Sequence, residues 1–316
     1  MHEPSAGPDA KKRFLPLVLG AAILGISVSG PLARLSEAHP LAIASWRLTF
    51  ALLIIGLFLA ATGSWREYRG LTRRDLLIAT GAGALLAVHF WTWIASLSLT
   101  SVAASVVLVN MHPVVIVAGS ALWLGERPTR RQLLGIAIAL VGAAILGLGE
   151  AAGAQGAAGG AGAAAGARTG SANLLGQALA LIGATAVGLY YLAGRSVRQR
   201  LSLWPYVGLV YGACLATLLI FVAILRVPLW PLPPREFLIF AGIALGPMML
   251  GHTGFNWALR YAPAYVVSLA VLAEPVGATL LAALIPGIGE IPGPWTIVGG
   301  GIILGGLALG ALEDRR

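Results

Sequence analysis

The sequence predicts an all-α integral membrane protein with about ten transmembrane helices, arranged as two inverted five-helix repeats. Three observations support this fold class. The 316 residues are 58% hydrophobic and only 10% charged, with a mean hydropathy of +0.86, whereas soluble domains carry about 25% charged residues. Apolar runs of about 20 residues, long enough to cross a bilayer, recur along the whole chain. The second half also repeats landmarks of the first half in the same order.

The apolar runs define ten predicted spans. They cover residues 14–36, 40–62, 75–98, 101–123 and 131–149 in the first half, and 173–197, 205–225, 236–259, 263–285 and 293–312 in the second. Helices are expected rather than barrel strands, because barrel strands show as short alternating segments. The predicted organisation is a tail at 1–13, a first repeat at 14–149, a linker at 150–172, a second repeat at 173–312 and a tail at 313–316.

The 21 Lys and Arg residues predict the orientation in the membrane. If the N-terminus is cytoplasmic, 16 of the 21 fall on the cytoplasmic side, as the positive-inside rule requires. The remaining five are Arg34, Arg47, Arg168, Arg226 and Arg235. We therefore expect both termini in the cytoplasm and a multi-pass protein of the inner (plasma) membrane. The net charge of +9 then faces anionic lipid, so nucleic acid is not an expected partner.

The N-terminal basic residues and the Ala/Gly-rich segment mark two further features. The apolar run after Arg13 is longer than a secretory signal core and is followed by many more spans, so an uncleaved first span is preferred. The stretch "EAAGAQGAAGGAGAAAGARTGS" (150–171) contains no large apolar residue. This composition predicts a flexible external linker between the halves.

The two halves align with each other. "SLSLTSVAASVVLVNMHP" (96–113) matches "ALRYAPAYVVSLAVLAEP" (258–275) without gaps, and "GERP" (125–128) matches "GEIP" (289–292). Farther on, Gly135 and Gly142 match Gly299 and Gly306 at the same spacing of seven residues. An odd number of spans in each half makes the second half upside down. Inverted repeats are typical of secondary transporters, whose binding site lies near the membrane midplane between the repeats.

These landmarks resemble the EamA-type family of the drug/metabolite transporter superfamily. The resemblance rests on "HPLAIASWRLTFALL" in the second span, on the residue–proline motifs in the fourth and ninth spans, and on the "GE-x-P" boundaries, each followed by a glycine-dotted helix. It covers nearly the whole chain outside the tails and the linker. It implies a secondary transporter that exports a small organic solute (an amino acid, a metabolite or a drug) by alternating access. One departure is His112, where the family more often has an acidic or a neutral residue.

Two prolines predict kinks beside ionisable residues. Glu274 precedes Pro275 and is the only acid deep within a predicted span, and His112 precedes Pro113 at the aligned position. A charged group near the bilayer centre usually faces a cavity or a partner, and a proline leaves one backbone carbonyl without its usual donor. Glu274 is therefore either a proton- or ammonium-binding group or a hydrogen-bonded structural residue. The same two interpretations hold for His112, since an unperturbed histidine titrates near neutral pH.

Arg47 and several aromatic and polar residues complete the candidate site. Arg47 lies about seven residues into its span and is expected to bind a carboxylate, to pair with Glu274 or to snorkel to the interface. The other candidates are His89, Trp93, Tyr190, Tyr191, His252, Asn256 and Trp257. Helical spacing places His89 with Trp93, and His252 with Asn256, on shared faces. Each of these residues either lines the cavity or packs in the core, and we expect Trp91 to point elsewhere.

The sequence contains no motif of a known class of enzyme and no metal-ligand spacing. Ser105 and His112 lie two helical turns apart, too far for a nucleophile and its base. We therefore expect no enzyme activity, no cofactor and no metal. The expected partners are a small-molecule substrate, membrane lipid and coupled protons. The two GxxxG patterns at 301–310 indicate close helix contact, either within the bundle or in a homodimer.

Two other functions remain open at this stage. One is facilitated exchange without proton coupling, and the other is a lipid translocator or a membrane scaffold. A solute transporter requires its buried polar residues to share one cavity. The scaffold interpretation instead expects Arg47, His89, His112, His252 and Glu274 to face lipid or separate helix interfaces.

Overall fold

A computed structural model describes residues 12–99, 105, 108–157, 171–284 and 294–311, and no strand occurs among them. The helices of the first half are α2 (Leu15–Ser27), α3 (Ser29–Arg34), α4 (Pro40–Thr62), η1 (Ser64–Gly70), α5 (Arg73–Leu99), α7 (His112–Gly119), η2 (Ser120–Leu124) and α8 (Arg130–Ala157). Those of the second half are α9 (Ser171–Arg198), α10 (Leu203–Leu225), α11 (Pro234–Ile243), η3 (Ala244–His252), α12 (Thr253–Ala258), α13 (Ala264–Val271), α14 (Glu274–Leu284) and α15 (Pro294–Ala311).

Six helical stretches within the described residues are long and apolar enough to cross a membrane. They are Leu15–Ala33, Pro40–Thr62, Arg73–Ser96, Leu174–Arg198, Leu203–Leu225 and Pro234–Ala258. Shorter apolar helices cover His112–Leu124, Ala264–Ala278 and Ile297–Gly310. The predicted all-α class with many apolar helices is therefore confirmed, and the count of ten spans stays a prediction.

Local sequence signals explain where several helices begin and end. Pro40 occupies the first turn of α4, where its missing N–H costs nothing, and the Nδ1 atom of His39 accepts a hydrogen bond from the Leu41 amide at 3.2 Å. Gly63 (φ 66°) and Gly125 (φ 67°) end α4 and η2 in the left-handed region, which glycine adopts without a Cβ clash. The first "GE-x-P" motif thus ends a helix as expected. The second copy lies outside the described residues.

Helix α8 continues to Ala157, eight residues into the predicted linker. Alanine is the strongest helix former, so this segment continues the helix although it lacks the large apolar residues of a membrane span. The rest of the predicted linker before Ser171 lies outside the described residues.

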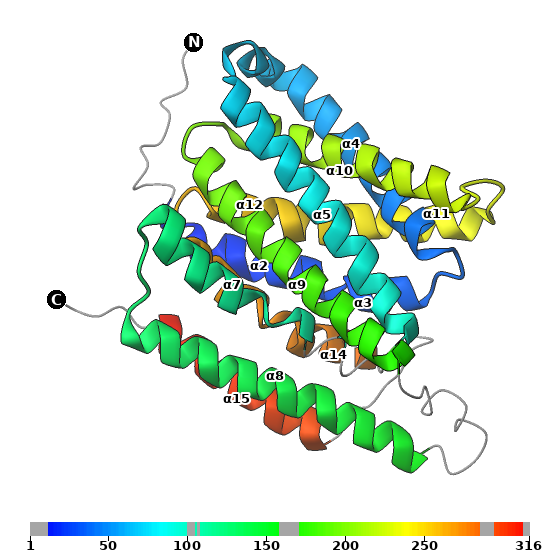
Figure 1. Ribbon diagram of the computed structural model, residues 1–316, viewed down its shortest axis with the longest axis vertical. Helices are drawn as coiled ribbons and strands as arrows, with labels where there is room; N and C mark the ends of the chain where they lie inside the picture. The colour runs from blue at the N-terminus through cyan, green and yellow to red at the C-terminus, as the bar shows by residue number, and fades with distance from the viewer. Residues whose placement is uncertain (1–11, 100–104, 106–107, 158–170, 285–293, 312–316) are drawn as a thin grey trace.

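Helices of one half pack against helices of the other half in matched pairs (Figure 1). The third helix of each half contacts the first helix of the other half. The third helix of the first half, α5, packs on α9, and η3, part of the third helix of the second half, packs on α2. The second helices pair with each other as α4 and α10, and the fifth helices pair as α8 and α15. The same contact therefore recurs in both directions, as expected for two repeats related by a pseudo-twofold axis.

The aligned glycines of α8 and α15 show this relation in detail. A Cβ atom on Gly135 would lie 2.6 Å from the Gly306 carbonyl oxygen, and one on Gly142 would lie 2.7 Å from that of Gly299. Residue numbers rise along α8 as they fall along the facing α15, so these two equivalent helices are antiparallel. The contacts are also crossed. Gly135 faces Gly306, which aligns with Gly142, and Gly142 faces Gly299, which aligns with Gly135. Gly306 and Gly310, the second GxxxG pattern, thus make a contact within the bundle, whereas nothing lies within 4 Å of a Cβ atom on Gly301 or Gly305, the first pattern.

Acidic residues near the starts of α5 and α11 provide a second matched pair. Asp75 forms an ion pair with Arg200 of the second half at 2.7 Å. Glu236, only 3% exposed, accepts hydrogen bonds from the Ser36 hydroxyl and, at 3.1 Å, from the Glu37 amide of the first half. Each acid thus fixes the loop that follows the first helix of the opposite half.

The short helix η1 packs against the start of α10. The Tyr68 hydroxyl donates to the Pro205 carbonyl at 3.3 Å. Burial raises the pKa of Tyr68, and the nearby Glu67 carboxylate raises it further by a smaller amount. The hydroxyl therefore keeps its proton and remains a hydrogen-bond donor.

Candidate functional site

A cavity of about 160 Å³ lies between the two halves. Seven of the candidate residues line it: Arg47, His89, Trp93, His112, Tyr191, His252 and Glu274. The five ionisable residues among them come from α4, α5, α7, η3 and α14, so both halves contribute. The arrangement is that required of a solute site. It differs from the scaffold interpretation, which separates these side chains.

Glu274 and His112 are each the first residue of a helix. Glu274 begins α14 after a break that follows Val271, and His112 begins α7. Pro275 and Pro113 are therefore second residues of helices, where the ring fits and the missing N–H leaves no bond unmade. The expected kinks are thus breaks where a helix ends and a new one starts. Pro275 lines the cavity, whereas Pro113 is buried beside it.

The break places Glu274 at the amino end of α14, where the helix dipole favours a negative charge. The Ser27 hydroxyl of α2 donates to the Glu274 backbone carbonyl at 3.3 Å, so the segment is attached to the opposite half at this residue. Glu274 is partly exposed to the cavity, which it lines.

Arg47 is buried within α4 and is only 3% exposed. Its Cζ atom lies 3.6 Å from the centre of the Phe90 ring, a cation–π contact. In the described part of the chain, its Nε and Nη2 atoms have no hydrogen-bond partner. No ion pair joins it to Glu274 there either. Of the three expectations for Arg47, snorkelling and a standing pair with Glu274 are therefore absent from this structure.

The three histidines of the cavity are held by different contacts. His89 donates through Nδ1 to the Gly183 carbonyl at 3.0 Å and stacks on Trp93 with ring centres 6.2 Å apart. His112 donates through Nδ1 to the Val109 carbonyl at 3.2 Å, and no described residue bonds its Nε2. In a neutral histidine bonded in this way, Nε2 is an acceptor. His252 lies edge-on to the Phe90 ring, with centres 5.5 Å apart.

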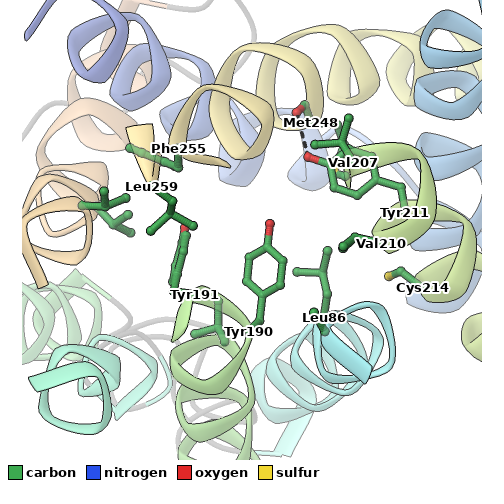
Figure 2. Packing of buried hydrophobic residues seen from close by; sticks show 14 of the residues in the cluster. Leu86, Tyr190, Tyr191, Val207, Val210, Tyr211, Cys214, Met248, Phe255 and Leu259 are labelled. Atoms are coloured by element: carbon green, nitrogen blue, oxygen red, sulfur yellow. Dashed lines mark hydrogen bonds between the residues drawn. The ribbon is translucent and has the colours of Figure 1, made fainter. Parts of the chain in front are cut away.

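Tyr190, Asn256 and Trp257 do not line the cavity. Tyr190 and Asn256 are fully buried, and the Asn256 side-chain amide donates to the Tyr190 hydroxyl at 2.6 Å. Figure 2 shows Tyr190 beside Tyr191, with ring centres 5.1 Å apart, within the apolar cluster that also contains Leu86 and Val210. Adjacent residues of a helix point about 100° apart, which is why Tyr191 reaches the cavity and Tyr190 does not.

Trp257 and Trp91 pack outside the cavity. Trp257 packs on Tyr261 with ring centres 4.5 Å apart. Trp91 packs on Phe221, also at 4.5 Å, so it points elsewhere as expected.

Sequence reasoning missed Phe90 and Asn110, both of which line the cavity. Phe90 precedes Trp93 by three residues, so the same helical spacing that selected His89 could have included it. Asn110 is a polar residue within an apolar run, two positions before His112. That exception to the hydrophobic pattern was a usable signal.

A second polar cluster joins the halves at the carboxyl end of α9. Arg195 forms an ion pair with Glu126 at 2.7 Å and donates to the Leu259 carbonyl, also at 2.7 Å. Arg198, only 2% exposed, donates to the Asn256 backbone carbonyl at 2.9 Å. The Asn256 side chain in turn bonds Tyr190, and the next residue, Tyr191, lines the cavity. The cluster is therefore separated from the cavity by a single layer of hydrogen-bonded residues.

No group of three His, Cys, Asp or Glu side chains within the described residues could hold a metal ion. Cys214 is a free thiol and is fully buried in the apolar cluster (Figure 2).

Comparison with known proteins shows similarity to a transporter family and to solved structures. A family model described as the EamA-like transporter family matches residues 14–148 and 174–311, and these bounds agree with the two predicted repeats. A solved crystal structure superposes with a TM-score of 0.73 at 22% sequence identity, covering 96% of this chain and 98% of that chain. At this identity the second match shows a common fold. No curated protein matches the sequence.

Proposed function

Because the chain belongs to the EamA-like transporter family, we propose that it is a secondary transporter that exports a small organic solute across the inner membrane by alternating access. In this proposal the chain has ten spans in two inverted repeats, both termini are cytoplasmic, and the protein is not an enzyme. The binding site is the cavity between the halves.

One observation carries the proposal. Five ionisable residues from five helical elements line a single cavity, although burying each of them in a membrane is costly. The aromatic side chains of Phe90, Trp93 and Tyr191 form an apolar wall around these ionisable residues. A few convergent polar groups in an otherwise apolar pocket are typical of small-molecule sites.

The cavity volume of about 160 Å³ bounds the size of the solute. An engineered cavity of about 150 Å³ in another protein accepts benzene. In this conformation the site therefore fits an amino acid or a metabolite with about one ring. A larger drug requires the cavity to widen.

We further propose that transport is coupled to protons through Glu274. Its carboxyl group lines the cavity without a standing ion pair among the described residues, so it can gain or lose a proton as the solute changes place. His112, with an unbonded Nε2 within the described chain, is a second proton-binding group of the same cavity.

The test uses proteoliposomes, a solute found by screening amino acids, metabolites and toxic analogues for export or growth resistance, and an imposed pH gradient. In Glu274→Gln, gradient-driven uptake is expected to fall to the level of empty vesicles, while solute exchange at equal pH continues. Glu37→Gln, an exposed residue between α3 and α4, serves as the matched control.

Equal gradient-driven uptake by wild type and Glu274→Gln would remove Glu274 as the coupling group. Uptake that ignores the gradient in both proteins, with exchange intact, would instead support facilitated exchange. Movement of labelled lipid without movement of any solute in the panel would support a lipid translocator.

A further inference from the structure

Arg47 carries a positive charge that takes part in no ion pair among the described residues. The side chain is 3% exposed, so it cannot reach water as an interfacial arginine does. Its Nε and Nη2 atoms have no hydrogen-bond partner in the described part of the chain. A buried, unpaired guanidinium is strongly unfavourable, and arginine cannot readily avoid the cost by losing its proton.

The cation–π contact with Phe90 stabilises one face of the Arg47 guanidinium but provides no hydrogen-bond acceptor. A ring whose centre lies 3.6 Å from Cζ can cover one face of the planar guanidinium, whereas the N–H bonds lie in its plane. The N–H groups along one edge of a guanidinium match the two oxygens of a carboxylate, which they bind as a pair of parallel hydrogen bonds. The unmet requirement is therefore for an acceptor of this shape.

The other ionisable residues of the cavity do not meet that requirement. His89, His112 and His252 carry no negative charge in either protonation state. Glu274 lines the same cavity, but no ion pair joins it to Arg47 in the described structure. An amine bound at Glu274 would leave the N–H groups of Arg47 without acceptors, whereas a bound anion would supply acceptors and balance the charge.

From these contacts we propose that Arg47 is a carboxylate-binding residue and that the transported solute carries a carboxylate group. Phe90 holds the guanidinium in place, and Glu274 remains available for a proton or for an amine elsewhere on the solute. The inference rests on the proposed function, and it narrows the solutes from neutral, cationic and anionic compounds to carboxylates.

The experiment measures the melting temperature of the purified, full-length protein with matched ligands. The panel has an acetate-, a phenyl- and an indole-sized scaffold, each supplied as the acid, the amide and the amine. The acids are expected to raise the melting temperature of the wild type more than their amides and amines do. In Arg47→Gln the apparent affinity for the acids is expected to fall about ten- to hundredfold, as for loss of a charged hydrogen-bonding partner.

Three further variants separate carboxylate binding from a structural role. Arg47→Lys keeps a positive charge without the planar fork, so it should retain a weakened preference for acids. Phe90→Leu removes the ring that covers the guanidinium and should weaken the binding of the acids more than that of the amides. Arg235→Gln, at an exposed arginine outside the cavity, should behave as the wild type.

Several outcomes overturn the inference. These are equal stabilisation by acids and amides, no stabilisation of the wild type by any acid, and an unchanged acid preference in Arg47→Gln. A lowered melting temperature of the Arg47 variants with the acid preference intact would assign Arg47 a purely structural role.

Uptake of the same compounds into proteoliposomes separates this inference from the proposed function. If the acids bind through Arg47 but no compound crosses the membrane, transport is the part that fails. If amides or amines are transported as well as the acids, transport holds and the carboxylate requirement fails.

Discussion

At the scale of single residues, the cavity concentrates the cost of buried charge at Arg47 and Glu274. Both line it, and neither is neutralised by the other within the described structure. A static protein would be more stable with these two groups paired or replaced by apolar residues. In the proposed mechanism, these two groups are instead left to partners that come and go, namely the solute and the proton.

Tyr190 allows a residue-scale test of which tyrosine belongs to the site. Tyr190→Phe removes the acceptor of the Asn256 amide, a 2.6 Å hydrogen bond in the buried layer, and leaves that amide unsatisfied. We expect a loss of about 1–3 kcal/mol in stability, seen as a lower melting temperature, with unchanged affinity for the solute.

Tyr191→Phe is the matched variant, because Tyr191 lines the cavity. It should change the affinity for the solute more than it changes the melting temperature. A change in solute affinity in Tyr190→Phe, with only a change in melting temperature in Tyr191→Phe, would show that Tyr190 rather than Tyr191 faces the cavity.

The sequence was sufficient to find most of the polar positions but not to assign each of them. Glu274, His112 and Arg47 stand out because charge within an apolar run is rare. Tyr190, Asn256 and Trp257 give a weaker signal, as uncharged polar or aromatic side chains within apolar runs, and they pack in the layer beside the cavity. Which side a polar residue faces depends on where each helix starts and how it is rotated. The breaks before Glu274 and His112 change that rotation in a way that periodicity along an unbroken span does not anticipate.

At the scale of helices, glycine decides how closely α8 and α15 approach. We expect Gly142→Ala to lower stability by about 1–3 kcal/mol, the usual range for overpacking, because its Cβ atom would lie 2.7 Å from the Gly299 carbonyl oxygen. Gly301→Ala is the matched control in α15, since nothing lies within 4 Å of the position of its Cβ.

Thermal melting of both variants in the same detergent checks this expectation. Equal melting temperatures would mean that the two helices can separate at Gly142 without cost. A large loss in Gly301→Ala would indicate a second contact at that face, such as the homodimer left open by the sequence.

Helix positions were largely predictable, and their ends were less so. Each predicted span is mostly helical over its described residues, because hydropathy reports burial in lipid directly. The end of α8 at Ala157 was missed, since alanine continues a helix by backbone propensity alone and hydropathy is insensitive to that.

At the scale of the whole molecule, the distribution of Lys and Arg predicts which side each loop occupies. In a background with Cys214→Ala, which removes the one cysteine, a membrane-impermeant thiol reagent applied to intact cells should label Glu37→Cys and Arg226→Cys. It should not label Arg66→Cys or Arg130→Cys until the cells are opened. The reverse pattern would invert the proposed orientation and with it the side from which the solute is taken.

The relation between the two halves was visible in the sequence, whereas the cavity between them was not. Aligned landmarks predicted two repeats, and the family match covers both. The cavity arises from contacts between helices far apart in the chain, such as α5 with α9 and α2 with η3. No local pattern contains that information.

The crossed contacts of Gly135 with Gly306 and of Gly142 with Gly299 have a consequence for how such a chain can be assembled. Since Gly135 aligns with Gly299 and Gly142 with Gly306, the contact face of α8 is complementary to a copy of itself. In detergent, where no membrane fixes its orientation, a first half expressed alone is therefore expected to pair with a second, antiparallel copy about a true twofold axis. In these terms the full chain resembles a homodimer joined into one chain, whose halves are free to differ, with His112 in one and Glu274 in the other at the aligned position.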